Sequence, residues 1–424
     1  MDLSIILPTL NEAENIRELV TGLGQALDAL GITYEILVVD GGSTDETIRY
    51  AAASNAHTRV ILQSSPGYGQ ALRSGFAAAR GEFLITMDAD GSHPPSLIAD
   101  LWRARVGCDM AIASRYVLGG KVEMPESRRV ASIVLNRFMS RGLSLPISDL
   151  SSGYRLNKAR IVQDLKLDAN KFDILAEIAV RVFAEGWRVV EIPLDYKPRQ
   201  GGRSKAKLIR FGWAFLSTFV RMWRLRNSID CADYDDRAYD SIIPLQRYWQ
   251  RKRYEIVTRF ASQAGMTLDI GCGSSRIIKA LTPMVGVDIL LRKLRYARKF
   301  GKPLANGSIW ALPFRADAFD CVVCSEVIEH IPAGDLPFTE IRRVLKPGGR
   351  LVLGTPDYGP PWWRMFEAAY KIAAPGGYAD EHITHYTRQS LIKLVERHGF
   401  VVNDMDYILG SELILSCTLK AKTE

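Results

Sequence analysis

The stretch Ile85–Pro95, ITMDADGSHPP, constrains the fold of this chain more than any other. An apolar run over residues 82–87 ends in Asp88, Asp90 follows two residues later, and a glycine and two prolines then break the chain. This pattern predicts a buried strand that carries two carboxylates into a loop at its carboxyl end, where open α/β sheets bind ligands. The two carboxylates would hold one Mg²⁺ or Mn²⁺ ion, which would in turn bind a diphosphate. The competing interpretation is a solvated acidic turn.

Strand-like and helical patterns alternate around this stretch. Strands are expected at residues 4–7, 34–39, 60–63, 82–87 and 109–113, and helices at 13–30, 45–53 and 71–80. Ser43 or Thr44 is expected to cap the helix 45–53. Such alternation predicts an α/β domain with a mostly parallel sheet and helices on both faces. Asp40 ends the second strand, so it would lie on the same edge as Asp88 and accept a hydrogen bond from a ribose or a base.

Composition bounds the class of protein. A chain of 424 residues with 47% hydrophobic and 24% charged residues predicts two globular domains. The net charge is +8, and every ionisable side chain between residues 203 and 226 is basic. This local excess favours an anionic surface, either phosphate or membrane, over general nucleic-acid binding. The basic residues are Arg203, Lys205, Lys207, Arg210, Arg221, Arg224 and Arg226.

The six cysteines show no disulfide framework. Cys321 and Cys324 lie in a strand-like run, FDCVVCSEV, which would place them on opposite faces and argues against zinc or redox chemistry. Met1 leads directly into a strand, so no signal peptide is expected, and no run reaches the ~18–20 apolar residues of a spanning helix. The expected location is cytoplasmic, peripheral at the cytoplasmic face of a membrane.

Several motifs in the first half resemble glycosyltransferase family 2, and within it the dolichyl- or polyprenyl-phosphate mannosyltransferases. They are LPTLNEAENI, ILVVDGGSTDET, ITMDADGSHPP, SRYVLGG, DLSSGYRL and PRQGGRSK, in that order between residues 1 and about 208. The resemblance implies a GT-A-type domain that transfers a hexose, most simply mannose from GDP-mannose, to polyprenyl or dolichyl phosphate. Gly41 stands where the family often has a second aspartate, which leaves the base open.

The resemblance also implies roles for individual residues. Asp88, Asp90 and Ser92 match the metal positions, although Ser92 stands where the family often has glutamine. The nucleotide-sugar positions are Pro8, Thr9, Asn11, Glu12, Asp40 and Gly42. The phosphate-binding positions are Arg115, Arg128 or Arg129, Ser132, Arg199 and Lys205. The acceptor phosphate is already anionic, so catalysis would rest on positioning and on neutralising phosphate charge. Asp149 would have either a structural role in a turn or a role on the acceptor side of the site.

Residues 207–226 combine phenylalanine and tryptophan with arginine at both ends. The segment is too short to span a bilayer and suits an interfacial helix beside anionic head groups. The alternative is a helix packed on its own sheet or in an oligomer interface. We expect the glycosyltransferase domain at 1–229, a linker and leading helix at 230–254, and a second domain at 255–424.

The second half is centred on MTLDIGCG, residues 266–273, a short strand followed by a glycine turn. The next strand, 285–288, ends in Asp288, which would take two ribose hydroxyls. A glycine turn after one strand and an acid after the next indicate an adenosine-type ligand.

The remaining motifs resemble a Rossmann-fold S-adenosylmethionine-dependent methyltransferase over residues 254–420. They include ALPFRADAFDCVVCSEVIEHIP and HITHYTRQSLIKLVERHGF. The resemblance implies that the cofactor contacts Asp269, Gly271, Cys272, Gly273, Asp288, Ile289, Ser308 and Ser325, with Glu326 lining the site. Ser308 replaces the usual aspartate. His382 and His385 are candidates for a base, and their spacing admits a metal site; a structural role is favoured for His330.

Together these features predict a bifunctional enzyme that uses Mg²⁺ or Mn²⁺ and S-adenosylmethionine, with an unknown methyl acceptor. One alternative is a UDP-sugar donor or a glycan acceptor. Another is a second half that only binds the cofactor or a partner. The sequence does not indicate an oligomeric state.

Overall fold

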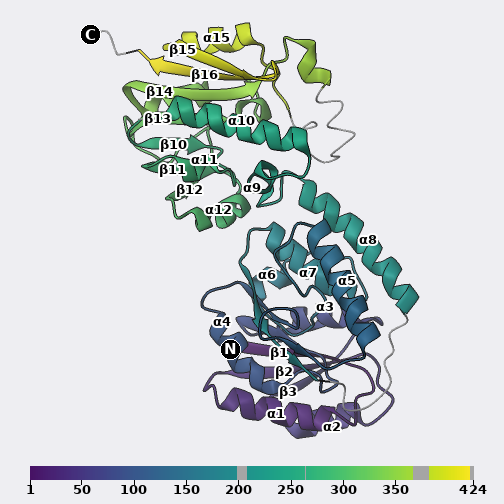
Figure 1. The fold of residues 1–424 in the computed structure, drawn as a ribbon. Coiled ribbons are helices and arrows are strands. Elements are labelled where there is room, and N and C mark those ends of the chain that lie inside the picture. Colours follow the sequence, from purple (N-terminus) through teal and green to yellow (C-terminus); the bar gives the residue numbers. More distant parts are fainter. Residues whose placement is uncertain (198–207, 263, 366–381, 421–424) are drawn as a thin grey trace. The chain divides into compact units, whose positions relative to one another are not determined.

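The computed structural model describes residues 1–197, 208–262, 264–365 and 382–420, without the side chains of residues 208–212. The chain forms two compact units, residues 1–183 with 187–223, and residues 184–186 with 224–424 (Figure 1). Arg199 and Lys205, two expected phosphate-binding residues, lie outside the described residues. No helix in the described ranges is long and apolar enough to cross a bilayer.

The first unit is built on a seven-stranded sheet in the order β3-β2-β1-β4-β7-β5-β8. All neighbouring pairs are parallel except those of β7, which runs antiparallel to both β4 and β5. The expected mostly parallel sheet is therefore confirmed. Its strands are β1 (Leu3–Thr9), β2 (Tyr34–Asp40), β3 (Thr58–Leu62), β4 (Phe83–Thr86), β5 (Met110–Ser114), β7 (Arg155–Lys158) and β8 (Val189–Pro193). A separate parallel pair consists of β6 (Lys121–Val122) and β9 (Asp195–Tyr196).

Helices cover both faces of this sheet. Leu3, Ile5 and Leu7 alternate along β1 and pack with α1 and α4 on one face. Gly75 of α3 approaches the other face so closely that a Cβ there would clash with Cγ2 of Ile6. The helices are α1 (Ile16–Asp28), α2 (Thr47–Ser54), α3 (Tyr68–Ala78), the 3-10 turn η1 (Pro95–Leu97), α4 (Ile98–Ala104), α5 (Glu126–Gly142), α6 (Ala159–Gln163), α7 (Asp173–Ala184) and α8 (Leu208–Asn227).

The expected capping of α2 by Ser43 or Thr44 is wrong. The helix begins later, and Glu46 is its N-cap without a side-chain cap bond. Both hydroxyl residues belong to the preceding loop, where Ser43 Oγ donates to Asp40 and the Thr44 amide donates to Asn11 Oδ1. These bonds engage both residues within the loops after β1 and β2, so neither residue caps the helix.

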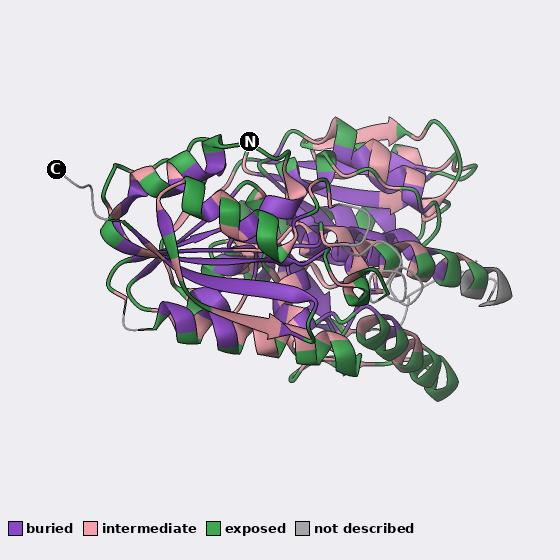
Figure 2. Ribbon diagram, turned by 90° about the horizontal axis from the view of Figure 1, so that it is seen from above, coloured by how far each residue is buried: buried purple, intermediate pink, exposed green. Residues whose placement is uncertain are grey.

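The second unit has its own seven-stranded sheet, in the order β12-β11-β10-β13-β14-β16-β15. The first five strands in this order are parallel, and β16 runs antiparallel to both β14 and β15. Figure 2 shows the strands of both sheets largely in the buried colour. The strands are β10 (Thr267–Ile270), β11 (Met284–Asp288), β12 (Leu304–Asn306), β13 (Phe319–Ser325), β14 (Leu345–Pro356), β15 (Phe400–Ile408) and β16 (Glu412–Leu419).

Two cores lie on opposite faces of this sheet. Phe338 of α13 and Leu391 of α15 belong to one core, and Ile256 of α10 belongs to the other. Cys324 is in the first core and Cys321 in the second, which confirms that the two thiols face opposite sides. The helices are α9 (Tyr234–Tyr239), α10 (Pro244–Ala261), α11 (Ile277–Ala280), α12 (Leu291–Ala297), η2 (Arg298–Phe300), η3 (Ile328–His330), α13 (Leu336–Val344) and α15 (Arg388–Arg397). All six cysteines are buried and free.

Candidate active sites

The carboxyl edge of the first sheet gathers the predicted donor-site residues. β1 pairs with β2 on one side and β4 on the other, with Thr9 opposite Asp40. Asp88 lies two residues after the end of β4, so it leaves the sheet at the same edge as Asp40. The register therefore places the acid after β2 and the acidic pair after β4 on either side of β1.

Asp88 and Asp90 lie in a loop that is held by several hydrogen bonds. Asp90 Oδ1 accepts from both the amide and the hydroxyl of Ser92, at 3.1 and 2.6 Å. Asp88 Oδ1 accepts from the Tyr68 hydroxyl at 3.2 Å, and the Asp88 amide donates to His93 Nδ1 at 3.0 Å. These bonds fix the loop, and 31% of the Asp88 side chain remains open to solvent.

The electrostatics of this loop fit a bound cation. Desolvation raises the pKa of the Asp88 carboxyl, and the nearby Asp90 raises it further. Among the described residues the ion-pair partner of Asp88 is His93, whose Nε2 lies 4.0 Å from Oδ2. Burial lowers the pKa of His93, so the ring is neutral at neutral pH and does not balance the carboxylates. A divalent cation on Asp88 and Asp90 would supply that balance.

The other predicted nucleotide-binding residues shape the adjacent loops. Asp40 is buried, and its Oδ2 accepts from the amides of Gly42 and Ser43, each at 2.8 Å. Asn11 has a φ of 51° and receives a bond from the Thr44 amide, so the loops after β1 and β2 are joined. Asp40 thus holds a turn, and its predicted contact with the nucleotide stays a prediction. Pro8 and Thr9 end β1, and Glu12 Oε2 accepts from Asn15.

The predicted phosphate-binding residues that the structure describes lie in different local environments. Arg115 makes a bidentate ion pair with buried Asp149, with both N–O distances 2.8 Å, and also donates to Ser151. Asp149 therefore serves to fix Arg115. Ser132 accepts from the Tyr116 hydroxyl at 2.7 Å. Arg129 is exposed and pairs with Glu126 on the same helix, and Arg128 is also exposed.

The glycine loop of the second unit brings the predicted cofactor residues together. Gly271 and Gly273 have φ values of 66° and 53°, a conformation that favours glycine. Asp288 closes the loop, because its carboxylate accepts from the amides of Gly273 and Leu290 at 2.8 and 2.7 Å. Cys272 is buried beneath the loop, whereas Ile289 is exposed.

Asp269, at the end of β10, provides a test of whether a cationic cofactor fits. Its side chain is buried, and Oδ2 has no hydrogen-bond partner among the described residues. Burial raises the pKa of Asp269 far above its usual range, and Asp288 and Asp235 add to this effect. A ligand with a positive charge, such as an α-amino or sulfonium group, would satisfy this carboxylate. Ser308 lies on the loop after β12 and Ser325 ends β13.

A charged cluster that the sequence did not reveal lies beyond β13. Arg253 of α10 binds buried Glu412 through two 2.7 Å contacts and lies 3.2 Å from Glu326. Burial raises the pKa of Glu326 well above its usual range, and Glu326 has a φ of 59°. Only the three-dimensional fold brings residues 253, 326 and 412 together, so no local pattern could have identified the cluster.

The three histidines weighed as bases separate into two environments. His382 lies beside His330, with ring centroids 5.0 Å apart, and its Nδ1 is 2.7 Å from the Tyr358 hydroxyl. His385 is exposed and stacks on Tyr358. Glu329 lies next to His330 and is fully buried, and burial raises its pKa to about 8. His382 therefore lies in a cluster with His330 and Glu329, and His385 lies outside it.

Comparison with known proteins assigns each unit a separate likeness. Residues 4–166 match the family described as glycosyl transferase family 2, and residues 268–353 match a methyltransferase domain. A dolichol-phosphate mannosyltransferase of Pyrococcus furiosus is 38% identical over 216 residues, which are 49% of this chain and 60% of that protein. The chain therefore spans less than two thirds of that relative.

A polyprenol monophosphomannose synthase of Mycolicibacterium smegmatis is 33% identical over 241 residues, covering 54% of this chain and 89% of that protein. Among solved structures, an SAM-dependent methyltransferase of Thermotoga maritima, titled a possible histamine N-methyltransferase, aligns with 42% of this chain and 98% of its own. Its sequence identity is 21% and its TM-score 0.33.

Proposed function

Because this chain belongs to the family 2 glycosyltransferases and carries a methyltransferase domain behind its glycosyltransferase domain, we propose that it is a bifunctional enzyme. The first unit transfers a hexose, mannose from GDP-mannose, to a polyprenyl or dolichyl phosphate. The second unit methylates an acceptor with S-adenosylmethionine. The observation that carries the first assignment is the likeness to two proteins named for polyprenyl-phosphate mannosylation, together with the aspartate pair at the carboxyl edge of the sheet.

The chemistry of the first unit follows from charge and position. The acceptor phosphate oxygen forms a bond to C1 of the sugar while the bond from C1 to the diphosphate oxygen breaks, so no proton has to be removed first. A divalent ion on Asp88 and Asp90 would neutralise the leaving diphosphate. Asp40 and Asn11 hold the two loops that frame the donor, and Tyr68 and His93 keep Asp88 in position. This arrangement supports catalysis by alignment and charge neutralisation.

An apolar surface on two neighbouring helices of the first unit supports a membrane-bound acceptor. α5 and α8 lie side by side, because the rings of Phe138 and Phe219 are 4.7 Å apart and Gly142 faces Phe219. Both helices expose apolar side chains with basic residues near them. The exposed apolar residues are Val130, Val134, Phe138, Trp213, Leu216 and Val220, and the exposed basic residues include Arg137, Arg141 and Arg224.

The structure corrects the membrane-facing side of α8. Phe215, an aromatic residue of the segment expected to lie at the bilayer interface, is buried, and Thr218 on the same helix donates to Asp173 at 2.8 Å. One face of α8 therefore packs on its own unit, as the alternative interpretation held, while Trp213 and Leu216 stay exposed. We expect Trp213→Asp/Val134→Asp to abolish flotation with anionic liposomes. Thr21→Asp, an exposed site on α1, is the matched control; unchanged flotation of the double variant would contradict membrane binding.

A donor panel tests the glycosyl transfer directly. The full chain would be incubated with Mn²⁺ or Mg²⁺, a polyprenyl phosphate and each labelled nucleotide sugar, and label would be counted in the organic phase. Label from GDP-mannose alone is the expected result. Label from a UDP-sugar alone would show that the donor is a UDP-sugar instead of GDP-mannose. Label confined to a water-soluble glycan would show that the acceptor is a glycan instead of a polyprenyl phosphate.

Cofactor binding tests the second unit. Titration calorimetry with S-adenosylmethionine should show binding because the glycine loop, Asp288 and the unsatisfied Asp269 form a site for a cationic nucleoside. An absence of heat would favour the alternative that this unit is an interaction module without catalysis.

A further inference from the structure

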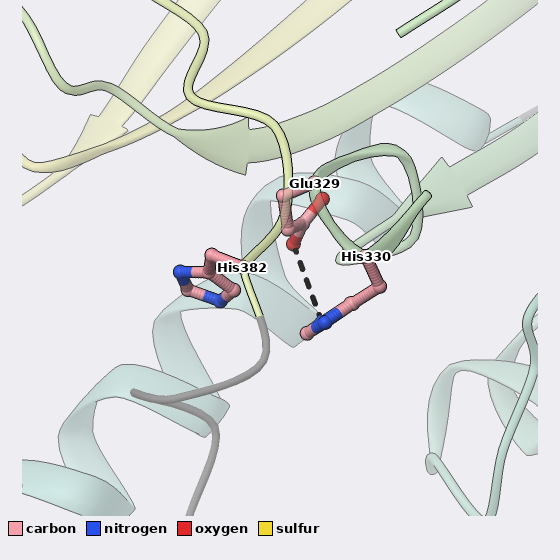
Figure 3. Close-up of side chains that lie close together, drawn as sticks. All are labelled: Glu329, His330 and His382. Atoms are coloured by element: carbon pink, nitrogen blue, oxygen red, sulfur yellow. Dashed lines mark ion pairs between the residues drawn. The ribbon is translucent and has the colours of Figure 1, made fainter. Parts of the chain in front are cut away.

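A cluster of three potential metal ligands lies in the second unit. Glu329 and His330 come from η3, the turn after β13, and His382 comes from the segment before α15 (Figure 3). One ligand atom from each residue lies within 4.8 Å of the others. Residues far apart in sequence thus present two imidazoles and one carboxylate to the same small volume.

Main-chain bonds hold the two contributing segments together. The carbonyl oxygen of Glu329 accepts from the amides of Ile383 and Thr384, at 2.8 and 3.0 Å. The hydroxyl of Thr384 in turn donates to the carbonyl of Ile331 at 2.7 Å. These bonds join the turn that carries Glu329 and His330 to the residues that follow His382, so they hold the three positions close together.

The side chains are also oriented for a common ligand. Glu329 is fully buried, Oε2 accepts from Thr355 at 3.1 Å, and Oε1 has no hydrogen-bond partner among the described residues. That oxygen lies 3.9 Å from Nε2 of His330. The bond between His382 Nδ1 and the Tyr358 hydroxyl sets the ring orientation, as outer partners do for metal-binding histidines.

We propose that Glu329, His330 and His382 bind a divalent transition-metal ion such as Zn²⁺, Co²⁺ or Mn²⁺. Imidazole nitrogens together with one carboxylate suit ions of this class better than Mg²⁺ or Ca²⁺, which prefer oxygen ligands. Ligands at ~2.0–2.2 Å from a tetrahedral ion are ~3.4 Å apart, so the cluster closes by little more than an ångström on binding. Three protein ligands leave at least one coordination position open.

The position of the cluster suggests its use. β13 pairs in parallel with β10, with Cys324 opposite Ile270, so η3 and the glycine loop leave the sheet at the same edge. The open metal position would take a hydroxyl oxygen of the methyl acceptor and lower its pKa. The acceptor proton then passes to water, an oxygen–carbon bond forms to the methyl group, and the sulfonium carbon–sulfur bond breaks to leave S-adenosylhomocysteine. This role rests on the proposed methyl transfer, whereas metal binding does not.

Metal titration of the full chain tests the site. The double variant Asp88→Asn/Asp90→Asn would serve as the background, because it removes the other predicted metal site. Equilibrium dialysis with Zn²⁺ and the visible absorption of bound Co²⁺ should both report one ion per chain in this background. His330→Asn or His382→Gln should weaken binding at least ~100-fold, since even outer-partner changes cost ~10–100-fold. Tyr358→Phe should weaken it by ~10–100-fold.

His385→Gln is the matched control, because His385 is a nearby histidine that is exposed and outside the cluster. Retained S-adenosylmethionine binding in each variant would show that the unit is folded. Equal metal binding by the background, His330→Asn and His382→Gln would overturn the proposal. If the metal binds but its removal leaves methyl transfer unaffected, the metal site would be supported and its role in activating the acceptor would be overturned.

Discussion

The two sheets carry the same arrangement of acids and differ in how the charges are balanced. In the first unit Asp40 ends the second strand and bonds the amides of Gly42 and Ser43; in the second, Asp288 ends the equivalent strand and bonds the amides of Gly273 and Leu290. In both, the acid holds a loop at the carboxyl edge. In a parallel sheet, an acid at the carboxyl end of the second strand can therefore hold the ligand-binding loop, whichever ligand the site binds.

The acids beyond these loops are balanced differently. Asp88 and Asp90 lie near a neutral histidine, so the first site is rich in oxygen ligands. In the second unit Arg253 neutralises Glu326 and Glu412, and Glu329 lies with two histidines. The acid pair of the first unit therefore suits a hard cation. The second unit instead combines a protein ion pair with a glutamate–histidine cluster that suits a softer metal ion.

The largest expected effect is on Asp90. Asp90→Ala should lower sugar transfer by ~10³-fold or more, because a metal that stabilises the leaving diphosphate contributes several kcal/mol to the transition state. Label transfer to the organic phase measures this. S-adenosylmethionine affinity should stay unchanged. Asp100→Ala, which changes an exposed acid on α4, is the control. Full transfer activity with the metal chelated would contradict a metal-dependent first site and so remove this difference between the two units.

The next effect concerns Arg253. Arg253→Met should lower the free energy of unfolding of the second unit by ~3–5 kcal/mol, because it leaves the fully buried Glu412 without its cation and removes the contact with Glu326. Hydrogen exchange followed on peptides from each unit during urea unfolding would measure it. Arg251→Met should cost no more than ~1 kcal/mol, since its pair with Asp240 is exposed. Equal losses in the two variants would contradict the assigned role of Arg253.

Asp288 is expected to give an intermediate effect. Asp288→Ala should weaken S-adenosylmethionine binding by ~10–100-fold, as expected when hydrogen bonds to a charged group worth ~1.5–3 kcal/mol are lost from the glycine loop. Calorimetry measures the change. Asp404→Ala, an exposed acid on β15, should bind normally. An unchanged affinity in Asp288→Ala would show that the loop does not form the cofactor site.

The smallest effect separates stability from substrate binding at Arg129. Arg129→Met should leave the urea midpoint of the first unit unchanged, because its pair with Glu126 is exposed. It should raise the KM for the lipid phosphate by ~10-fold if the guanidinium binds that phosphate. Arg103→Met removes a similar exposed pair on α4 and should leave KM unchanged. Identical kinetics for both variants would exclude Arg129 from the acceptor site.

Sequence patterns predicted the parts of the fold that depend on local periodicity. The strand into Asp88 and the glycine turn after β10 both appear, because apolar runs and glycine turns specify their conformation within a few residues. The start of α2 was misplaced, since Ser43 and Thr44 bond to the loop after β1 instead of to the helix. That competition depends on a segment more than thirty residues away.

The candidate sites show the same limit. Asp88, Asp90 and Asp288 were predicted from their places at strand ends, which the sequence reveals directly. Arg253, Glu329 and Glu412 were not, because their importance arises from burial and from partners on distant elements. Likewise the sequence of α8 did not reveal which of its aromatic side chains are buried, and only its packing shows that Phe215 faces inward and Trp213 outward.

The main-chain bonds from Ile383 and Thr384 to the Glu329 carbonyl have an evolutionary consequence. These bonds involve backbone atoms, so they persist whichever side chains occupy positions 329, 330 and 382. Single substitutions can therefore exchange a histidine for cysteine or aspartate while the spacing of the positions is retained. Relatives with the same backbone would be able to change ligand preference, and hence methyl acceptor, one residue at a time without rebuilding the fold.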